Sequence, residues 1–348
     1  MKLNGITLLS HVKKAQSSTG SEMVSLRAAN GRLYISSFNE GRNFVCAMPV
    51  ESNDSWECSF RPADTFSRTL PQIVDLDCDG KSLSIKTATY AGKYPIEPYA
   101  KAVFPDVRAQ QVSADQTNLL IAGLKLTDVG EFLSAPTFEF SFKDSFECAC
   151  WDRVHFSYYT TKYSGEHLSA KMLATDIAAL VLAVPEAKKF GAEEGIFLLQ
   201  SSTTKFSIPG LQVEGSEGLA ELSQIHQNFT KPACTVNPGE LFMALYRAES
   251  ACGSGQPVEM SVEKDRIKIS ATSSKGEYVE VIAADSVVKK GLKVKVDPAT
   301  AMDVIRLTKV ETAQFGVYES FVWLAAEMDN GGVHYMAVLT SQSESEGE

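Results

Sequence analysis

The sequence lacks the features that mark a membrane protein or a secreted, disulfide-bonded protein. No apolar run approaches the roughly 20 residues that a helix needs to cross a bilayer. The first residues, Met1–Thr7, lack the apolar core and the small-residue cleavage site of a signal peptide. The seven cysteines are odd in number and scattered, and no CxxC pair occurs among them. We therefore expect free thiols, no membrane association and a cytoplasmic protein.

The sequence also lacks the short motifs of catalysis and of metal binding. It has no GxSxG, no GxxxxGK[ST] and no GxGxxG after a predicted strand. The five histidines are far apart, and none pairs at the spacing of metal ligands. The segment Asp75–Gly80 begins like a calcium-binding loop, but Lys86 stands where that loop needs a bidentate glutamate. We expect no enzyme activity, no metal and no cofactor.

Basic residues are outnumbered by acidic ones. The chain has 33 Lys and Arg residues against 43 Asp and Glu residues, which gives a net charge of −10. This balance argues against a protein coated with nucleic acid. An acidic protein can nevertheless carry a local basic face, because a partner responds to local potential rather than to total charge.

What the sequence does contain is a long repeat. A strand–turn–strand pattern occurs three times, at Val24–Ser36, Phe138–Cys150 and Val258–Ser270. The turns of successive copies are 114 and 121 residues apart. Solenoid repeats have periods of about 20–50 residues, so a repeat of this length is a whole domain. We predict three like domains at residues 1–110, 111–222 and 223–341, followed by a disordered acidic tail at 342–348.

The local pattern predicts antiparallel strands with one buried face. Apolar residues such as Met260 and Val262 alternate with polar ones, which is the period of a half-buried strand. The dipeptides Asn30-Gly31 and Asp79-Gly80 tolerate the positive φ angles of two-residue hairpin turns.

The sequence of each repeat also predicts two helices. Asn237 before Pro238, and Asp297 before Pro298, combine a helix N-cap with proline at the first helical position. The predicted helices span residues 8–16, 62–70, 116–132, 175–184, 239–251 and 298–310, with a short helical turn within 217–225.

Basic residues recur on or beside the predicted helices. Each one alone is expected as a solvated surface charge, but together they occupy similar places in all three repeats of an acidic protein. This recurrence indicates a shared basic face. The set is Lys13, Lys14, Arg61, Arg68, Lys125, Lys188, Lys189, Arg247, Arg306 and Lys309.

Four segments of the third repeat carry a family resemblance. Pro257–Ala271 forms a strand–turn–strand that ends in I-x-I-x-A, and Gly276–Ile282 is similar to a G-E-A-x-E-x-I segment. Leu292–Asp297 is similar to a strand that enters a last helix, and His334–Leu339 stands where a Y-x-x-M-P-M ending is expected. These segments resemble the C-terminal domain of the bacterial DNA polymerase III β subunit, the sliding clamp.

The first two repeats resemble the same family mainly in layout. Leu70-Pro71 precedes a strand, Phe104-Pro105 closes the first repeat, and Ser207–Leu211 ends the second. There are departures from the family pattern. Its T-D-G-H-R-L run is Cys150–Phe156 here, and its M-P-M-R-L ending is Ala337–Ser341 followed by the acidic tail. These departures indicate a divergent, phage-like clamp.

The resemblance implies an α+β protein with the DNA clamp fold. Three repeated clamp-type domains would place antiparallel sheets outside and helices around a central hole. Two chains joined head to tail, repeat one to repeat three, would close a homodimeric ring of six domains around duplex DNA. The basic set would then contact phosphates without reading bases, as a sliding processivity factor requires.

The resemblance also implies a groove between the second and third domains. In the family this groove receives short peptides from the DNA polymerase and from the clamp loader. Carried over by position, its walls would be Arg153, His155, Phe156, Phe229, Pro232, Met336, Val338 and Leu339.

Two other functions stay open at the level of sequence. An enzyme with a site assembled from distant residues would need a pocket with strongly shifted acids and bases. A β-rich structural or virion protein would not need basic helices at similar places in each repeat. The oligomeric state separates these readings from the clamp, because a three-domain clamp chain is expected to be a dimer.

Overall fold

The structure is a computed structural model in which the chain forms two compact units. It describes residues 1–62, 70, 72–127, 137–151, 154–193, 195–210, 219–229, 231–286, 292–306, 308 and 310–340. The first unit contains residues 1–118 and 176–211, and the second contains residues 119–175 and 212–348.

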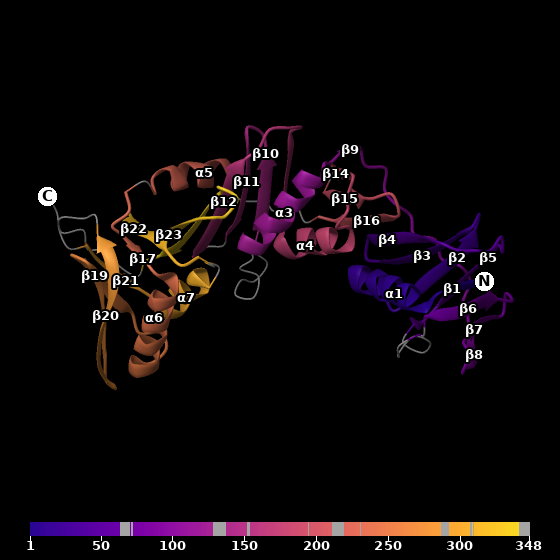
Figure 1. Ribbon diagram of the computed structural model, residues 1–348, viewed down its shortest axis with the longest axis horizontal. Helices are drawn as coiled ribbons and strands as arrows, with labels where there is room; N and C mark the ends of the chain where they lie inside the picture. Colours follow the sequence, from indigo (N-terminus) through magenta and orange to yellow (C-terminus); the bar gives the residue numbers. More distant parts are fainter. Residues whose placement is uncertain are drawn as a thin grey trace. The chain divides into compact units, whose positions relative to one another are not determined.

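The first unit is built on two antiparallel sheets (Figure 1). The larger has the strand order β5-β2-β3-β4-β16-β15-β14-β9, and the smaller has the order β1-β6-β7-β8. The strands are β1 (Lys2–Asn4), β2 (Val24–Ala29), β3 (Arg32–Asn39), β4 (Arg42–Pro49), β5 (Trp56–Phe60), β6 (Ile73–Cys78), β7 (Ser82–Lys86), β8 (Ala91–Pro95), β9 (Ala109–Gln111), β14 (Lys189–Glu193), β15 (Ile196–Gln200) and β16 (Thr204–Pro209).

The first hairpin has the turn that its sequence predicts. Asn30 and Gly31 have φ angles of 54° and 70°, as a two-residue turn of this kind requires. The flanking strands β2 and β3 pair from Ser25 opposite Ser36 onward, with Leu26 opposite Ile35 on the buried face. The hairpin prediction at Asn30-Gly31 is confirmed.

Helix α1 (Gly5–Thr19) lies on β3 and β4. The side chain of Asn4 accepts a hydrogen bond from the backbone N–H of Thr7 at 3.0 Å, which caps the first turn. Leu8, Val12 and Ala15 are fully buried along one face, and Gly20 ends the helix with a φ of 70°. The helix is therefore longer at both ends than the predicted 8–16.

Two further helices cross the division between the units. Helix α3 (Ala114–Thr127) begins close to the start of the helix predicted at 116–132, and residues 128–132 lie outside the described part of the chain. Helix α4 (Ala174–Ala183) matches the predicted helix 175–184. Of the helix predicted at 62–70, residues 63–69 lie outside the described part of the chain.

The second unit is built on one long antiparallel sheet. Its order is β13-β10-β11-β12-β24-β23-β22-β17-β20-β19-β18-β21. The elements are β10 (Thr137–Phe142), β11 (Ser145–Trp151), β12 (His155–Lys162), β13 (Leu168–Leu173), α5 (Leu219–Gln227), β17 (Cys234–Val236), α6 (Pro238–Cys252), β18 (Val258–Glu263), β19 (Arg266–Ser273), β20 (Gly276–Ser286), β21 (Leu292–Val296), α7 (Pro298–Ile305), β22 (Ala313–Tyr318), β23 (Phe321–Glu327) and β24 (Val333–Leu339).

The helix starts predicted in the third repeat are confirmed. Asn237 accepts a hydrogen bond from the N–H of Glu240 at 3.0 Å, and Asp297 accepts one from the N–H of Thr300 at 2.8 Å. A proline follows each cap, where its missing N–H leaves no bond unmade. The short helix expected within 217–225 is α5.

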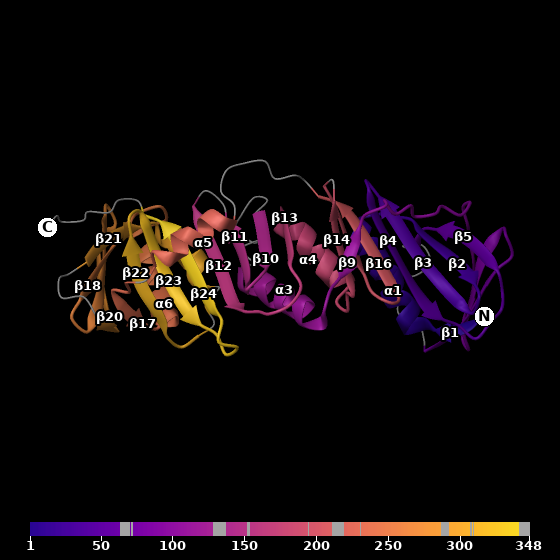
Figure 2. The ribbon, with the colours of Figure 1, turned by 90° about the horizontal axis from the view of Figure 1, so that it is seen from above.

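The sheets reveal the repeat as a three-dimensional pattern. Each repeat supplies one four-stranded set that ends in β4, β12 or β20, and another that ends in β8, β16 or β24. The two sets are joined across repeats in the same way twice: β4 pairs with β16 in the first unit, and β12 pairs with β24 in the second. We call these two pairings the seams. Figure 2 shows the two larger sheets, which contain the seams, from above.

Candidate functional site

Helix α1 carries two of the predicted basic residues. Lys13 is exposed, whereas Lys14 is half-buried next to His11. Burial lowers the pKa of Lys14, and burial together with the charge of Lys14 lowers the pKa of His11. Lys13 is therefore the better placed of the two for contact with an anionic partner.

The basic residues of the first two repeats are otherwise scattered. Arg61 follows β5 and is exposed, and Lys125 is exposed in the last turn of α3. Lys188 precedes β14 and Lys189 begins it. The ten residues of α4 contain no Lys or Arg, and Leu182 on this helix is 76% exposed. The basic face is thus uneven among the described helices.

Arg247 on α6 is engaged by a carboxylate. Its guanidinium donates two hydrogen bonds to Glu280 of β20, one of them from Nε to Oε2 at 3.0 Å. The hydroxyl of Tyr278 also donates to Glu280. The hydrogen bonds from Arg247 lower the pKa of Glu280, so this pair stays ionised at neutral pH. The carboxylate offsets the charge that Arg247 would offer to a phosphate.

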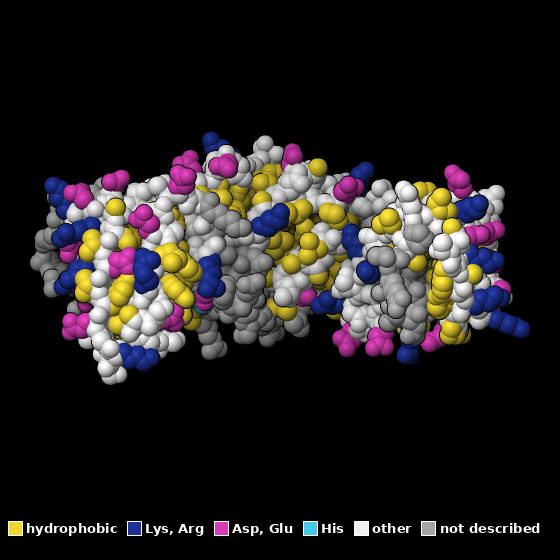
Figure 3. All heavy atoms as spheres, turned by 60° about the horizontal axis from the view of Figure 1, so that its bottom comes forward, with side chains coloured by type: hydrophobic (Ala, Val, Ile, Leu, Met, Phe, Trp, Pro, Cys, Tyr) yellow, Lys and Arg dark blue, Asp and Glu magenta, His cyan; other side chains and the backbone are white. Residues whose placement is uncertain are grey.

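Arg306 at the end of α7 also has near partners. It forms an ion pair of 3.7 Å with Asp303, and its guanidinium carbon lies 5.5 Å from the ring centre of Phe242 on α6. In the view of Figure 3, basic side chains are interspersed with acidic and apolar ones. The predicted residues Arg68 and Lys309 lie outside the described part of the chain.

The residues predicted for a peptide groove lie on two faces of the seam between β12 and β24. Side chains alternate along a strand, so His155 on β12 and Met336 and Val338 on β24 share one face. Phe156 belongs to the other face, together with Ala337, its partner across the seam. The structure does not bring all these side chains together in one groove.

On the face of the seam that carries Phe156, which we call the outer face, aromatic side chains form a closed cluster. Phe156 and Phe229 are 5% and 3% exposed. The ring of Phe229 is stacked on that of Trp323, with ring centres 5.4 Å apart and planes at 12°. Helix α5 covers this face (Figure 2). Its His226 stacks on Tyr158. The cluster occupies space that an open groove would need, and sequence reasoning did not identify Trp323.

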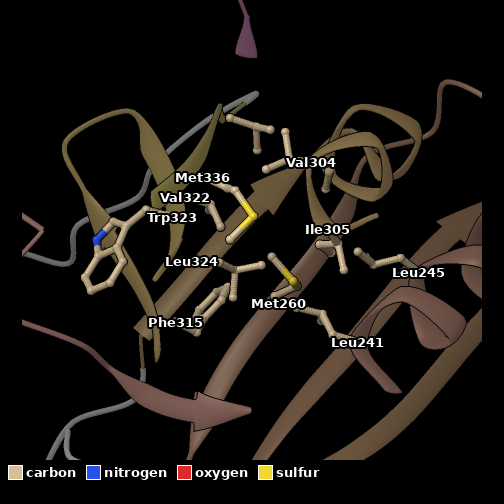
Figure 4. A pocket seen from close by; sticks show the side chains of 12 residues that line it. Leu241, Leu245, Met260, Val304, Ile305, Phe315, Val322, Trp323, Leu324 and Met336 are labelled. Carbon is tan, nitrogen blue, oxygen red and sulfur yellow. The ribbon is translucent and has the colours of Figure 1, made fainter. Parts of the chain in front are cut away.

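On the opposite face of the seam, which packs against α7, Met336 and Val338 belong to the core of the third repeat. They line an internal cavity of about 20 Å³ whose walls are entirely apolar, with Leu241 of α6 and Ile305 of α7 opposite them (Figure 4). Met336 is fully buried and Val338 is 3% exposed. This cavity is too small for more than a water-sized occupant.

The remaining predicted groove residues contribute less. Pro232 is half-buried between α5 and β17, and the backbone of Leu339 pairs with Phe321. Arg153 lies outside the described residues.

A buried hydrogen bond between two polar side chains joins the strands of the same seam. Ser157 of β12 and His334 of β24 are both fully buried, and the Oγ and Nε2 atoms are 2.8 Å apart. Burial lowers the pKa of His334 to about 3, so the imidazole is neutral. Its Nδ1 atom has no hydrogen-bond partner in the described structure. No third polar group completes a catalytic arrangement at this pair among the described residues.

Among the open strand edges of the described structure, two belong to the set-ending strands that take part in neither seam, β20 and β8. β20 pairs with β17 only over Ala284–Ser286, which leaves Gly276–Ala283 open on that side. β8 ends the small sheet of the first unit. Val279 and Val281 of β20 are 60% and 50% exposed, and Tyr90 before β8 is 49% exposed. Sequence reasoning did not single out these positions, because alternation alone does not tell an edge strand from an inner one.

Neither a metal centre nor a membrane span is found in the described part of the chain. No group of three or more His, Cys, Asp or Glu side chains could hold a metal ion there. No helix described is both long enough and apolar enough to cross a bilayer.

Comparison with known proteins gives a consistent result for the fold. No protein-family model and no curated protein matches the sequence. Among solved structures, the chain is similar to a DNA polymerase sliding clamp from Pseudomonas aeruginosa, with a TM-score of 0.78 at 12% identity over 98% of this chain and 99% of the other. A putative DNA polymerase III beta subunit from Eubacterium rectale gives 0.74 at 14% identity over 98% and 99%.

A beta clamp from Helicobacter pylori is similar as well, with a TM-score of 0.76 at 12% identity over 98% of this chain and 100% of the other. The chain therefore has the fold of the DNA polymerase III β sliding clamps along its whole length. The predicted fold class is confirmed, and so is the resemblance at the level of the fold.

Proposed function

We propose that this chain is a DNA sliding clamp, a non-catalytic processivity factor that encircles duplex DNA in the cytoplasm. The observation that carries the proposal is the match of all three repeats, in order, to sliding clamps over 98% of the chain. A structural or virion protein would need only sheets. It would not need a helix on each repeat in the places where a clamp has one.

The proposal includes a head-to-tail homodimer, and the seams support it. β4 pairs with β16, and β12 pairs with β24. The third member of the first set is β20 and the remaining member of the second is β8, and each has an open edge. A β20–β8 pairing between two copies would repeat the seam a third time and close a ring with two-fold symmetry.

Two exposed valines support the open edge of β20 as part of the joint between the two copies. Val279 and Val281 lie on the same face of β20, because they are two residues apart. An exposed apolar edge strand is a template for pairing with another strand. Burial of these side chains against a second copy would remove that liability.

DNA contact in this proposal is electrostatic and weak. Lys13, Lys125 and Arg61 are exposed, whereas Arg247 and Arg306 have acidic partners. Phosphate contacts of this kind are independent of sequence and sensitive to salt, which permits sliding. The arginines would exchange carboxylate partners for phosphates as DNA passes.

The proposal also includes the binding of partner proteins, without the exact groove residues predicted from the sequence. The polymerase and the clamp loader would bind through short peptides near the seam between β12 and β24. Because Phe156 and Phe229 are buried under α5, a peptide would first meet the half-buried rings at the rim of the cluster, such as Tyr318 and Phe321. A rim of this kind suits one or two apolar anchors.

The joint between copies is tested by sedimentation equilibrium. The unmodified chain is expected to have twice the mass of one chain at micromolar concentration. Val279→Glu combined with Val281→Glu should give the mass of one chain, because like charges would be buried at the joint. A circular dichroism spectrum like that of the unmodified chain would show that the variant is folded.

Val103→Glu is the matched control, because Val103 is 73% exposed and lies outside the strands. It is expected to remain dimeric. A chain that is monomeric without substitution, or a β20 variant that stays dimeric, would contradict the proposed joint.

A further inference from the structure

A polar cavity lies beside α5, on the outer face of the second repeat's sheet. Its volume is about 460 Å³, which lies in the range typical of ligand sites. One wall is α5, through Ser223 and Gln224, and the floor is formed by β10 and β11. All of these elements belong to the second unit.

Strand register places the polar floor of the cavity. Ser141 of β10 is directly opposite Glu147 of β11 and, on its other side, opposite Ser169 of β13. Glu139 lies two residues before Ser141, on the same face. These four side chains therefore form a continuous polar surface under α5.

The cavity carries net negative charge. Among the described residues that line it, Glu139, Asp144 and Glu147 are acidic and Lys143 alone is basic. One oxygen of Glu139 accepts a hydrogen bond from the N–H of Leu219 at 3.0 Å, and one oxygen of Glu147 accepts from Ser145 Oγ at 3.0 Å. Each carboxylate keeps a second oxygen with further acceptor capacity.

One hydroxyl group at this floor is enclosed without a hydrogen bond in the described structure. The Oγ atom of Ser141 is buried and has no partner in the described structure. A buried polar group left unpaired is costly, at about 1–3 kcal/mol, so such groups mark a place for a partner.

We propose that this cavity binds an arginine side chain of a partner protein. A guanidinium has five N–H donors in a planar fork, which suits a carboxylate and neighbouring hydroxyls together. Glu147 would accept two of these donors, with Ser141 and Glu139 accepting others. An anionic group is excluded by the carboxylates, and a lysine ammonium has too few donors for this many acceptors.

The arginine cavity is separate from the aromatic cluster and does not depend on DNA binding or on dimerisation. It lies over the outer face of β10 and β11, whereas the cluster centres on Phe229 and Trp323. A partner that crosses α5 could reach both. The cavity thus adds a polar, charge-selective contact to the apolar contacts proposed above.

The test uses the full chain and two short peptides. The probe is a fluorescein-labelled peptide, acetyl-Gly-Gly-Arg-Gly-Gly-amide, and its match has citrulline, which is neutral and of similar shape, in place of arginine. Fluorescence anisotropy should show saturable binding of the arginine peptide, about tenfold tighter than that of the citrulline peptide, since a charge-assisted pair is replaced by a neutral one.

Two variants locate the site. Glu147→Gln should weaken the arginine peptide about tenfold. Gln224→Trp, on the exposed face of α5, should block the cavity without changing the core. The control Glu327→Gln removes an exposed charge at the end of β23, outside the cavity lining, and should leave binding unchanged. The proposal is overturned by equal binding of the two peptides, by no saturable binding at millimolar peptide, or by full binding in both cavity variants.

Discussion

At the residue scale, Glu280 offsets the charge that Arg247 would offer to a phosphate. The two side chains share two hydrogen bonds on the surface of α6 and β20. The sequence placed Arg247 among the basic set from its position on a helix. It gave no sign of the carboxylate, because Glu280 is 33 residues away and meets Arg247 only when β20 packs against α6.

Replacing the carboxylate should strengthen DNA binding. In Glu280→Gln the hydroxyl of Tyr278 keeps an acceptor, while Arg247 loses its counter-charge. If α6 faces DNA, the affinity for duplex should rise, and the slope of log affinity against log salt should steepen by about one unit. A filter-binding series over several salt concentrations measures both quantities.

The matched control is Glu263→Gln, which removes a carboxylate from Arg266 in the hairpin between β18 and β19. Arg266 is not on a helix, so DNA affinity should not change. Equal gains in both variants would mean that total charge, rather than the α6 face, governs binding.

At the scale of elements, the seam between β12 and β24 depends on a neutral histidine. Ser157 and His334 are fully buried, and the imidazole has no second partner in the described structure. In the unfolded chain this imidazole binds a proton below a pH of about 6.5, whereas burial holds the folded pKa at about 3. The unfolded state therefore binds more protons between these values, and stability falls as the pH falls.

His334→Gln should remove this pH dependence, because an amide keeps the hydrogen bond to Ser157 without titrating. Between pH 7.5 and pH 5 the unmodified chain should lose about 2 kcal/mol more of its unfolding free energy than the variant loses. Urea denaturation at the two pH values measures the difference. His167→Gln, at an exposed site, should behave like the unmodified chain. Equal losses of unfolding free energy in all three proteins would show that His334 is not the source of the pH dependence.

Elements were predictable where the signal is local. The caps at Asn237 and Asp297 and the turn at Asn30-Gly31 depend on neighbouring residues only, and all three are confirmed. The proposed groove was not located to one place, since Phe156 and Met336 lie on opposite faces of the seam. The register between strands some 180 residues apart decides this, and no short motif encodes it.

At the scale of the whole molecule, the repeat is the strongest signal. Three hairpins at spacings of 114 and 121 residues predicted three copies, and the matched clamps have the same fold along the whole chain. The open edges of β8 and β20 could not be predicted, because an edge is a property of the assembled sheet. The basic set is uneven along the chain, since the cations predicted for the second half of the second repeat, Lys188 and Lys189, follow α4 rather than lie on it.

The central claim is that two chains close around DNA, and a topological test addresses it most directly. The protein is mixed with a nicked circular plasmid, and an amine cross-linker then closes the joints between the two protein copies. The mixture is passed through a size-exclusion column in high salt. We predict that protein elutes with the circle despite the salt and is released when a restriction enzyme opens the circle. Protein that leaves the intact circle in high salt, or that stays on the opened DNA, would contradict the account.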